Sequence, residues 1–295
     1  MDIQWYPGHM AKSRRELQAR LKITDLVIEV VDARAPASTR NPDLQPLLSG
    51  KPVVLVLNKS DLADPQVTPQ WQAWFRRRET PCLAVDSRRG VGVPELLEMI
   101  HLHQERPAGR LRPWRAVVVG IPNVGKSALI NQLARRRAMA VADRPGVTRG
   151  PQWLRLGPAL ELLDTPGLLW PKFTDPAAAL HLALVGAIAE ARLDASELAV
   201  RLLEILRDRY PQALPRRYGE PPDDGQNDPQ RWLDWIGRRR GLLAAGGKVD
   251  QERAVRVLLG DFREGRLGPV SLERPGEAQA SPGPLGPGVD RSGGA

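Results

Sequence analysis

Residues 120–127, GIPNVGKS, place two glycines, a lysine and a serine at the spacing of a phosphate-binding loop. In such a loop the glycines let backbone N–H groups turn toward phosphate oxygens, the lysine reaches the outer phosphates and the serine holds Mg²⁺. Lys126 is therefore the predicted phosphate lysine, which also acts in catalysis, and Ser127 is a predicted metal ligand. The remaining predicted nucleotide contacts of this loop are Asn123, Val124, Gly125 and Ala128. The pattern alone also fits an ATPase.

The residues Asn58, Lys59, Ser60 and Asp61 form a second polar group, and they directly follow the apolar run PVVLVL. The Asp61 carboxylate can accept hydrogen bonds from N1–H and N2–H₂ of guanine together. Adenine has no such donor pair and would leave a buried acceptor unpaired, which opposes an ATPase. Asn58 is expected to bind the other guanine edge and to hold the loop, and the Lys59 stem is expected to pack on the base plane. All four residues are predicted GTP contacts.

Three more loops carry groups that suit the same ligand. A backbone N–H of Asp86 or Ser87, after the apolar run PCLAV, can meet guanine O6. Asp164 opens the motif DTPG and is placed to bind Mg²⁺ through water, while the N–H of Gly167 is placed to meet the γ-phosphate. Thr148 lies between the two phosphate motifs, where a switch threonine would close on Mg²⁺ and assist catalysis. The alternatives are an ordinary strand-ending turn for DTPG and a polar loop residue for Thr148.

Alternating apolar runs and helical segments would position these groups. The runs are continuous and rich in β-branched residues, which is typical of a parallel sheet covered on both faces. The predicted strands cover residues 25–33, 52–59, 81–87, 115–120, 152–156 and 160–165. The polar groups stand at strand ends, where ligands bind in open α/β sheets. The sequence therefore predicts one guanine-nucleotide site whose base-reading half precedes its phosphate-reading half, a circular permutation of the usual GTPase order.

The chain is expected to divide into three parts. Residues 1–174 form a predicted α/β P-loop GTPase domain with a circularly permuted, six-stranded and mainly parallel sheet. Residues 175–273 form a predicted C-terminal all-α domain, because four segments with helical spacing each have Asp at or near the start, where it can cap a helix. Residues 274–295 are rich in Pro and Gly and are expected to be disordered.

Composition narrows the class of partner. The 295 residues carry a formal net charge of +9, which points to a polyanion such as nucleic acid. No apolar run reaches 18 residues, and the N-terminus lacks the apolar core of a signal peptide. We therefore expect a cytoplasmic protein without stable membrane association. The single cysteine, Cys82, is expected to be a small buried strand residue.

Several motifs together resemble the ribosome biogenesis GTPase A family over residues 3–273. They are WYPGHMAKSRREL, DARAPASTRNP, NKSD, GIPNVGKS, PGVTRG, DTPGLLWPKF and GRRRGLLAAGGKVDQERAVRVLLGDFREGRLG. The resemblance implies a bacterial enzyme that binds GTP and GDP with Mg²⁺ and hydrolyses GTP under stimulation by ribosomal particles. It also implies a role in late assembly of the large ribosomal subunit, with the precursor of that subunit and its rRNA as partners. Candidate RNA contacts in the helical part are Arg238, Arg239 and Arg240.

The residue that orients the attacking water is not found where Ras-like enzymes have it. Their glutamine follows the DTPG-type loop, and Leu168 stands there in this sequence. The resemblance nominates His9 as the catalytic candidate, since an imidazole can position or deprotonate water near neutral pH. Ordering of the N-terminal segment or RNA contact are the alternatives for His9. Asn123 resembles the asparagine that lets related GTPases bind K⁺ beside the phosphates, and it is a candidate K⁺ ligand.

Other functions remain open at this level. A GTP-gated switch could act on another RNA, on a protein or on a membrane surface. The basic clusters are KSRREL, Arg76–Arg78, Arg135–Arg137, Arg216–Arg217 and Arg238–Arg240. Each cluster alone also fits a solvated helix face. The RNA-facing surface is therefore inferred from all of the clusters together with the net charge. A scaffold that does not hydrolyse GTP is opposed by the complete set of phosphate and metal residues. A monomer is expected.

Overall fold

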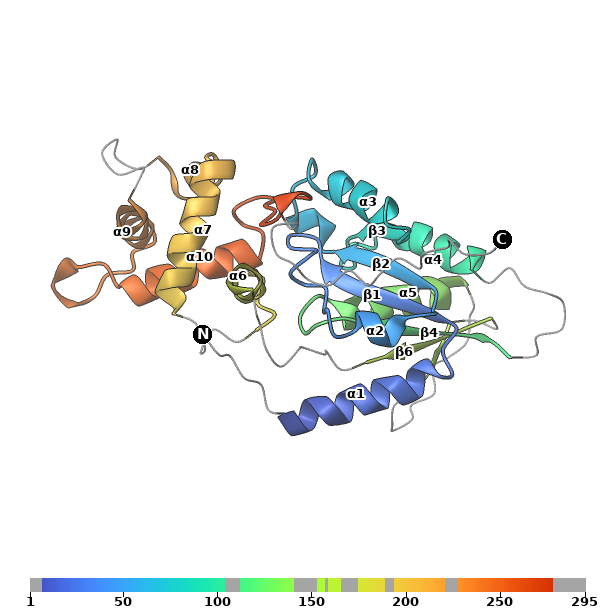
Figure 1. Cartoon of the computed structure of the whole chain (residues 1–295). Helices are drawn as coiled ribbons and strands as arrows, with labels where there is room; N and C mark the ends of the chain where they lie inside the picture. Colours follow the sequence, from blue (N-terminus) through green and yellow to red (C-terminus); the bar gives the residue numbers. More distant parts are fainter. Residues whose placement is uncertain are drawn as a thin grey trace, which may run out of the picture.

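The computed structural model describes residues 7–103, 112–140, 153–156, 159–165, 175–188, 194–220 and 228–277. For residues 7–13, 137–140 and 164 it describes the backbone alone. Figure 1 shows a twisted sheet with flanking helices on one side of the molecule and a group of helices on the other. Within the described part of the chain, no helix combines the length and apolar character that crossing a membrane requires.

Among the described residues, six strands form one sheet in the order β3-β2-β1-β4-β6-β5. Their bounds are β1 Leu26–Asp32, β2 Val53–Asn58, β3 Cys82–Val85, β4 Trp114–Val119, β5 Leu154–Arg155 and β6 Leu160–Asp164. Five strands run parallel, and β5 pairs antiparallel with β6 at the edge. The predicted six-stranded, mainly parallel and permuted sheet is confirmed. From β1 the chain adds strands toward one edge of the sheet, and from β4 it adds them toward the other edge. The position between β1 and β4 is therefore the topological switch point, where open α/β sheets bind ligands.

Both faces of the sheet are buried because side chains of successive strand residues point to opposite sides. In β1, Leu26, Ile28 and Val30 join one apolar cluster with α4 (Val93–Leu102) and α5 (Lys126–Ala140). On the other face, α1 (Pro7–Leu21) and α2 (Gln45–Leu48) cover one apolar cluster, and α3 (Thr68–Arg76) covers a second. Continuous apolar strands therefore give a sheet packed on both sides, as the sequence predicts.

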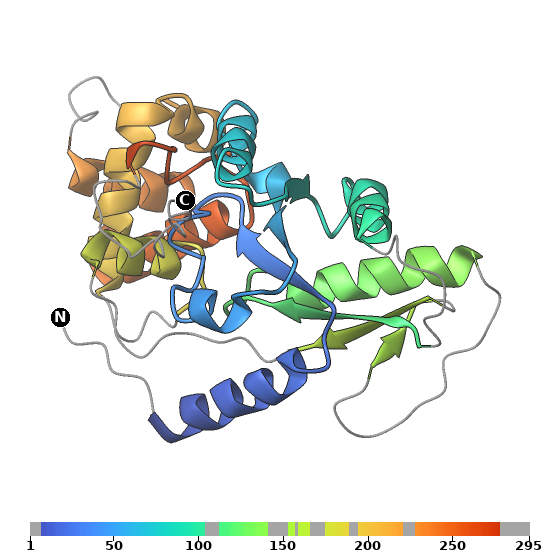
Figure 2. The ribbon, with the colours of Figure 1, turned by 45° about the vertical axis from the view of Figure 1, so that its right-hand side comes forward.

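In the described part of the chain, five α-helices follow the sheet. They are α6 Pro176–Leu184, α7 Ala195–Arg209, α8 Ala213–Tyr218, α9 Pro229–Arg239 and α10 Gln251–Arg263. Four of them begin after an aspartate whose side chain accepts a backbone N–H of the first turn, which confirms the predicted N-caps; these are Asp175, Asp194, Asp228 and Asp250. Their apolar faces continue the cluster that lies under α4 and α5. Figure 2 shows these helices beyond the carboxyl ends of the parallel strands.

The chain after α10 returns to the base-reading half. Val270 N–H donates to the Leu62 carbonyl at 2.9 Å, and Leu272 N–H donates to the Arg34 carbonyl at 2.7 Å. The Glu273 carboxylate accepts the backbone N–H groups of Ala37 and Ser38 at 2.8 and 3.0 Å. Residues 270–273 therefore fasten the helical region to the loops after β1 and β2.

The Cys82 thiol lies at the start of β3, 6% exposed, and confirms the predicted buried strand residue. Burial raises its pKa to about 12, which leaves almost no thiolate at neutral pH. We expect a disulfide reagent at pH 8 to modify the folded protein at least about 100-fold more slowly than the denatured chain, whose thiol has an ordinary pKa near ~8.5. Fast modification of the folded protein, followed by absorbance, would contradict this burial.

Candidate guanine-nucleotide site

The predicted phosphate loop joins β4 to α5 at the sheet's switch point. Its glycines sit where a side chain cannot fit: a Cβ on Gly125 would lie 2.3 Å from Asn58 Nδ2, and one on Gly120 would lie 2.3 Å from the Val30 carbonyl. Gly125 and Asn123 also adopt positive φ angles of 95° and 62°. The backbone therefore passes close beneath the base-reading half, and the first turn of α5 offers N–H groups to an anion.

Lys126 begins α5, and its side chain is turned into the loop. The ammonium donates to the Ile121 carbonyl at 2.8 Å, and the residue is 7% exposed. Ser127 and Ala128 follow in the first helical turn, and both are exposed. From this position in the loop the lysine ammonium can turn to phosphate oxygens, and the serine stands in the first turn of the helix, where the motif places the metal ligand. The residue types and the glycine cradle thus fit a nucleotide phosphate with its metal ion.

Asn58 ties the two halves of the site together. It ends β2 and is fully buried; its Nδ2 donates to the Val124 carbonyl at 2.7 Å, and its Oδ1 accepts the Ser87 N–H at 3.2 Å. The loop-holding role predicted for Asn58 is therefore visible in the structure. One side chain joins the loop after β2 to the phosphate loop and to the loop after β3. Contact between Asn58 and a guanine edge stays a prediction.

The other base-reading residues stand on the short helix η1 (Ser60–Leu62) and just before it. Lys59 adopts a left-handed conformation with φ 58°, and its ammonium lies 2.9 Å from Asp32 Oδ2. Asp61 is exposed at the carboxyl edge of the sheet. An exposed carboxylate there is open to the two donors of a guanine ring.

The loop after β3 is shaped by Asp86. Its carboxylate accepts the N–H groups of Arg88 and Arg89 at 2.9 and 3.1 Å, while its own N–H donates to the Val91 carbonyl. The N–H of Ser87 is directed to Asn58. The N–H groups of Asp86 and Ser87, which are predicted to meet guanine O6, are thus both hydrogen-bonded within the protein. A contact with O6 stays a prediction, and it requires one of these N–H groups to exchange its partner for the base.

The predicted metal and γ-phosphate residues are only partly described. Asp164 ends β6 opposite Val118 of β4, next to the strand that leads into the phosphate loop. The Thr165 hydroxyl donates to the Val118 carbonyl at 2.7 Å and fixes the start of the DTPG motif. The Asp164 side chain, the His9 side chain, Thr148 and Gly167 lie outside what the structure describes, although the backbone of His9 belongs to α1. Elsewhere in the described chain, no three His, Cys, Asp or Glu gather as a metal site.

The three candidate RNA-binding arginines end α9 and are exposed, but two of them also bond within the protein. Arg239 Nε donates to the Tyr218 carbonyl at 2.9 Å, and Arg240 lies 3.2 Å from Asp261. The Asp261 carboxylate also forms ion pairs with Arg217 and Arg266. One buried carboxylate thus gathers three guanidinium groups and leaves an excess of positive charge at this surface.

Two features of the site were not predicted. Asp32, at the end of β1, binds the Lys59 ammonium, and Asn123 Nδ2 donates to the Gly186 carbonyl after α6 at 2.7 Å. The first could have been suspected, because Asp32 is a polar residue at the end of an apolar strand like the other site residues. The hydrogen bond from Asn123 to Gly186 joins residues 63 positions apart in the chain, and no local sequence pattern predicts it.

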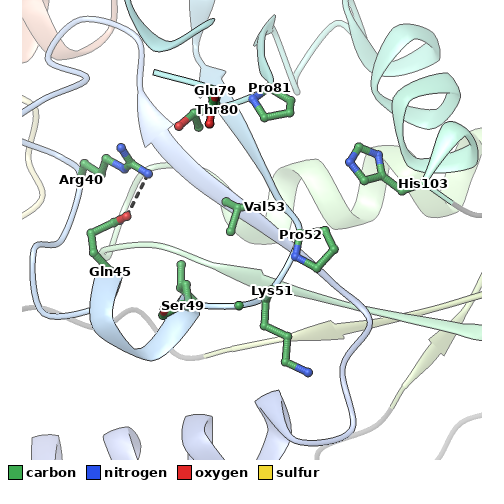
Figure 3. Close-up of a pocket in the computed structure, with 12 residues that line it drawn as sticks. Arg40, Gln45, Ser49, Lys51, Pro52, Val53, Glu79, Thr80, Pro81 and His103 are labelled. Atoms are coloured by element: carbon green, nitrogen blue, oxygen red, sulfur yellow. Dashed lines mark hydrogen bonds between the residues drawn. The ribbon is translucent and has the colours of Figure 1, made fainter. Parts of the chain in front are cut away.

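A cavity of about 450 Å³ lies elsewhere, at the amino ends of β2 and β3. Figure 3 shows Arg40 and Gln45, joined by a hydrogen bond, on one side and His103 on the other. Strands of a parallel sheet bring their ligand-binding loops to the opposite edge. This cavity is therefore separate from the nucleotide site.

Comparison with known proteins agrees with this geometry. A family model described as 50S ribosome-binding GTPase matches residues 115–211, starting in β4. Ribosome biogenesis GTPase A of Bacillus pumilus is 42% identical over 93% of this chain and 99% of its own. That of Thermotoga maritima is 33% identical over 92% and 95%. Mouse mitochondrial ribosome-associated GTPase 1 is 34% identical over 92% and 90%.

Two solved structures share the whole architecture. GNP-bound YlqF from T. maritima aligns with a TM-score of 0.65 and 29% identity, over 90% of this chain and 99% of that one. GDP-bound YlqF aligns with a TM-score of 0.66 and 29% identity, over 88% and 99%. These relatives thus match this chain over almost its full length. The protein is a GTP-binding GTPase, and it belongs to the ribosome biogenesis GTPase A family.

Proposed function

We propose that this GTPase is an assembly factor for the large ribosomal subunit, whose binding to the subunit precursor and its rRNA depends on bound GTP or GDP. The observation that carries the nucleotide half is Asn58, which holds the base-reading and phosphate-reading loops as one site. The names of the relatives support the ribosomal half. The net charge of +9 supports an RNA partner. We further propose a monomer that acts in the cytoplasm.

In the proposed reaction Lys126 leaves the Ile121 carbonyl and holds the β- and γ-phosphates, while N–H groups of the loop bind the remaining oxygens. Ser127 and Thr148 would hold Mg²⁺, with Asp164 acting through water, and the N–H of Gly167 would meet the γ-phosphate. The metal, when bound, neutralises charge on the phosphates. Asp61 would fix the base and thereby place the γ-phosphate against the loop.

His9 is proposed to position the attacking water, because Leu168 has no polar group for this task. We expect His9→Ala to lower ribosome-stimulated turnover by about 10²–10⁴-fold while nucleotide affinity stays the same. His103→Ala, at the opposite edge of the sheet, is the matched control. Unchanged stimulated turnover of His9→Ala would remove the catalytic role and leave the N-terminal segment a structural or RNA-binding one.

A potassium ion is proposed beside Asn123. Since Asn123 Nδ2 is committed to the Gly186 carbonyl, its amide oxygen is the atom that would coordinate the ion. We expect replacement of K⁺ by Na⁺ to slow GTP hydrolysis by at least about tenfold, as loss of a charge-stabilising contact does. Asn123→Gly, which tolerates the positive φ, should make the two salts equivalent. Equal wild-type rates in both salts would exclude this site.

The helical residues 175–273 are proposed to form the RNA-binding domain, with Arg238, Arg239 and Arg240 as contacts. The γ-phosphate state would reach them through the chain that runs from the DTPG motif into α6. Hydrogen exchange tests this route, because residues 175–265 should exchange differently with a GTP analogue and with GDP. The same exchange in both states would contradict it.

Co-sedimentation separates the ribosomal proposal from its alternative, a GTP-gated switch on another RNA, protein or membrane surface. We expect the protein to pellet with purified large-subunit particles in the presence of a GTP analogue, and to be released by GDP. Raising the salt from 50 to 200 mM should weaken binding steeply, as contacts to phosphates do. Absence from these particles in both nucleotide states would favour the alternative.

A further inference from the structure

A buried charge cluster lies behind the base-reading loop. Asp32, at the end of β1, is fully buried, and its carboxylate receives the Lys59 ammonium at 2.9 Å. The Arg34 guanidinium binds the same carboxylate with two parallel bonds, Nε to Oδ1 and Nη2 to Oδ2, each 2.9 Å long. Such a planar two-point pair fixes the orientation of both groups. Of these three residues, Lys59 is the one that belongs to the base-reading loop, and Asp32 joins it to Arg34.

Lys59 combines a left-handed backbone conformation with an ion pair at the end of its side chain. Its positive φ places a long side chain in a backbone region that costs about 1–3 kcal/mol for a residue other than glycine. Asp32 holds the ammonium end, so the aliphatic stem has two fixed points. Burial alone would raise the pKa of Asp32, but Arg34 and Lys59 hold that pKa well below its usual range. The carboxylate therefore stays charged at any working pH.

Arg34 also reaches the helical region. It is 1% exposed, its guanidinium lies 5.0 Å from the centre of the Phe262 ring, and Nη1 approaches the Phe262 carbonyl at 3.4 Å. Its own carbonyl accepts the Leu272 N–H. Phe262 belongs to α10 and Leu272 to the returning segment, so a continuous set of contacts runs from Lys59 through Asp32 and Arg34 to the helices.

We propose that Asp32 and Arg34 are positioning residues for guanine recognition: Asp32 holds Lys59 in place for the base, and Arg34 secures Asp32 against α10. This proposal rests on the proposed packing of Lys59 on the base. It means that base affinity depends on the docked helical region. This dependence is additional to the γ-phosphate route, because it acts through the base and is present with GDP.

Binding of GDP and of inorganic pyrophosphate tests the proposal, since pyrophosphate occupies the phosphate loop without a base. Arg34→Lys keeps the charge but loses the two-point bond and the reach to Phe262. We expect its GDP affinity to fall about tenfold and its pyrophosphate affinity to stay within about twofold, because the lost interaction concerns only the base. Phe262→Leu keeps an apolar side chain at this position of α10 but removes the aromatic ring beneath Arg34, and we expect about a threefold loss for GDP alone.

Tyr210→Phe is the matched control. Its hydroxyl bonds Asp64 and the Ser271 carbonyl, so the change loosens the same interface away from Arg34. We expect it to lower the melting temperature without changing either affinity. Equal losses for GDP and pyrophosphate in both Arg34→Lys and Phe262→Leu, or no loss in either, would overturn the proposal.

Asp61→Asn, measured alongside, separates the two proposals. If Asp61→Asn loses GDP binding while Phe262→Leu and Arg34→Lys keep it, base recognition stands and the positioning role fails. If Asp61→Asn also binds GDP normally, the base site itself is wrong. Hydrogen exchange adds a second readout: GDP should protect α10 in the wild type but not in Arg34→Lys.

Discussion

Asp61→Asn should bind GTP roughly 10³-fold more weakly than the wild type and should bind xanthosine triphosphate in its place. The carboxylate accepts two donors from guanine, and an amide replaces one of these acceptors with a donor. A site built to pair specific polar groups rejects a mismatched partner by such factors, since the unpaired groups are desolvated without compensation. Xanthine has a carbonyl where guanine has its amino group, so it matches the amide.

Titration of the purified variant with both nucleotides measures this exchange of preference. Asp61 is exposed, so the substitution should leave the melting temperature of the nucleotide-free protein within a degree or two. Asp43→Asn makes the same change at another exposed aspartate away from the site and should bind GTP normally. Normal GTP binding by Asp61→Asn would show that the base is read by other residues.

Gly125→Ala should lose at least about 100-fold in affinity for both GTP and GDP. The added methyl group would lie 2.3 Å from Asn58 Nδ2, and alanine is strained at the φ of 95° found there. Relief of that clash must displace either the phosphate loop or Asn58. Either displacement breaks the hydrogen bond from Asn58 Nδ2 to the Val124 carbonyl, which joins the base-reading loop to the phosphate loop.

Gly260→Ala is the control for this change. Gly260 lies within α10, and a methyl group there would meet nothing within 4 Å. The control should therefore bind nucleotide normally and should be slightly more stable, by up to about 1 kcal/mol, because alanine is the better helix former. Equal nucleotide affinity of the Gly125→Ala and wild-type proteins would contradict the close approach of the two loops.

The parts of the fold that follow from local pattern could be predicted from the sequence. Strands are visible as continuous β-branched runs, and helix starts as aspartates before apolar spacing. The prediction for residues 152–156 was too long, since β5 has only Leu154–Arg155. An edge strand pairs on one side alone, so its length depends on its neighbour β6 more than on its own residues.

Individual contacts between distant residues outside the nucleotide motifs could not be predicted. Nothing near Glu273 in the sequence shows that its carboxylate binds the loop after β1, 235 residues away at Ser38. Likewise, the arginine clusters predict a basic surface but not which guanidinium groups turn inward, as Arg240 does to Asp261. Such contacts depend on which elements meet in space, and the periodicity of each element leaves that open.

The rate of GTP hydrolysis with and without purified large ribosomal subunits tests the proposed ribosomal role most directly. We expect large subunits to accelerate hydrolysis at least about tenfold, small subunits to have little effect, and the acceleration to be lost as salt rises. Lys126→Ala should show no hydrolysis in any mixture and sets the background. The same rate with and without large subunits, in a preparation that binds GTP, would contradict the proposed role in ribosome assembly.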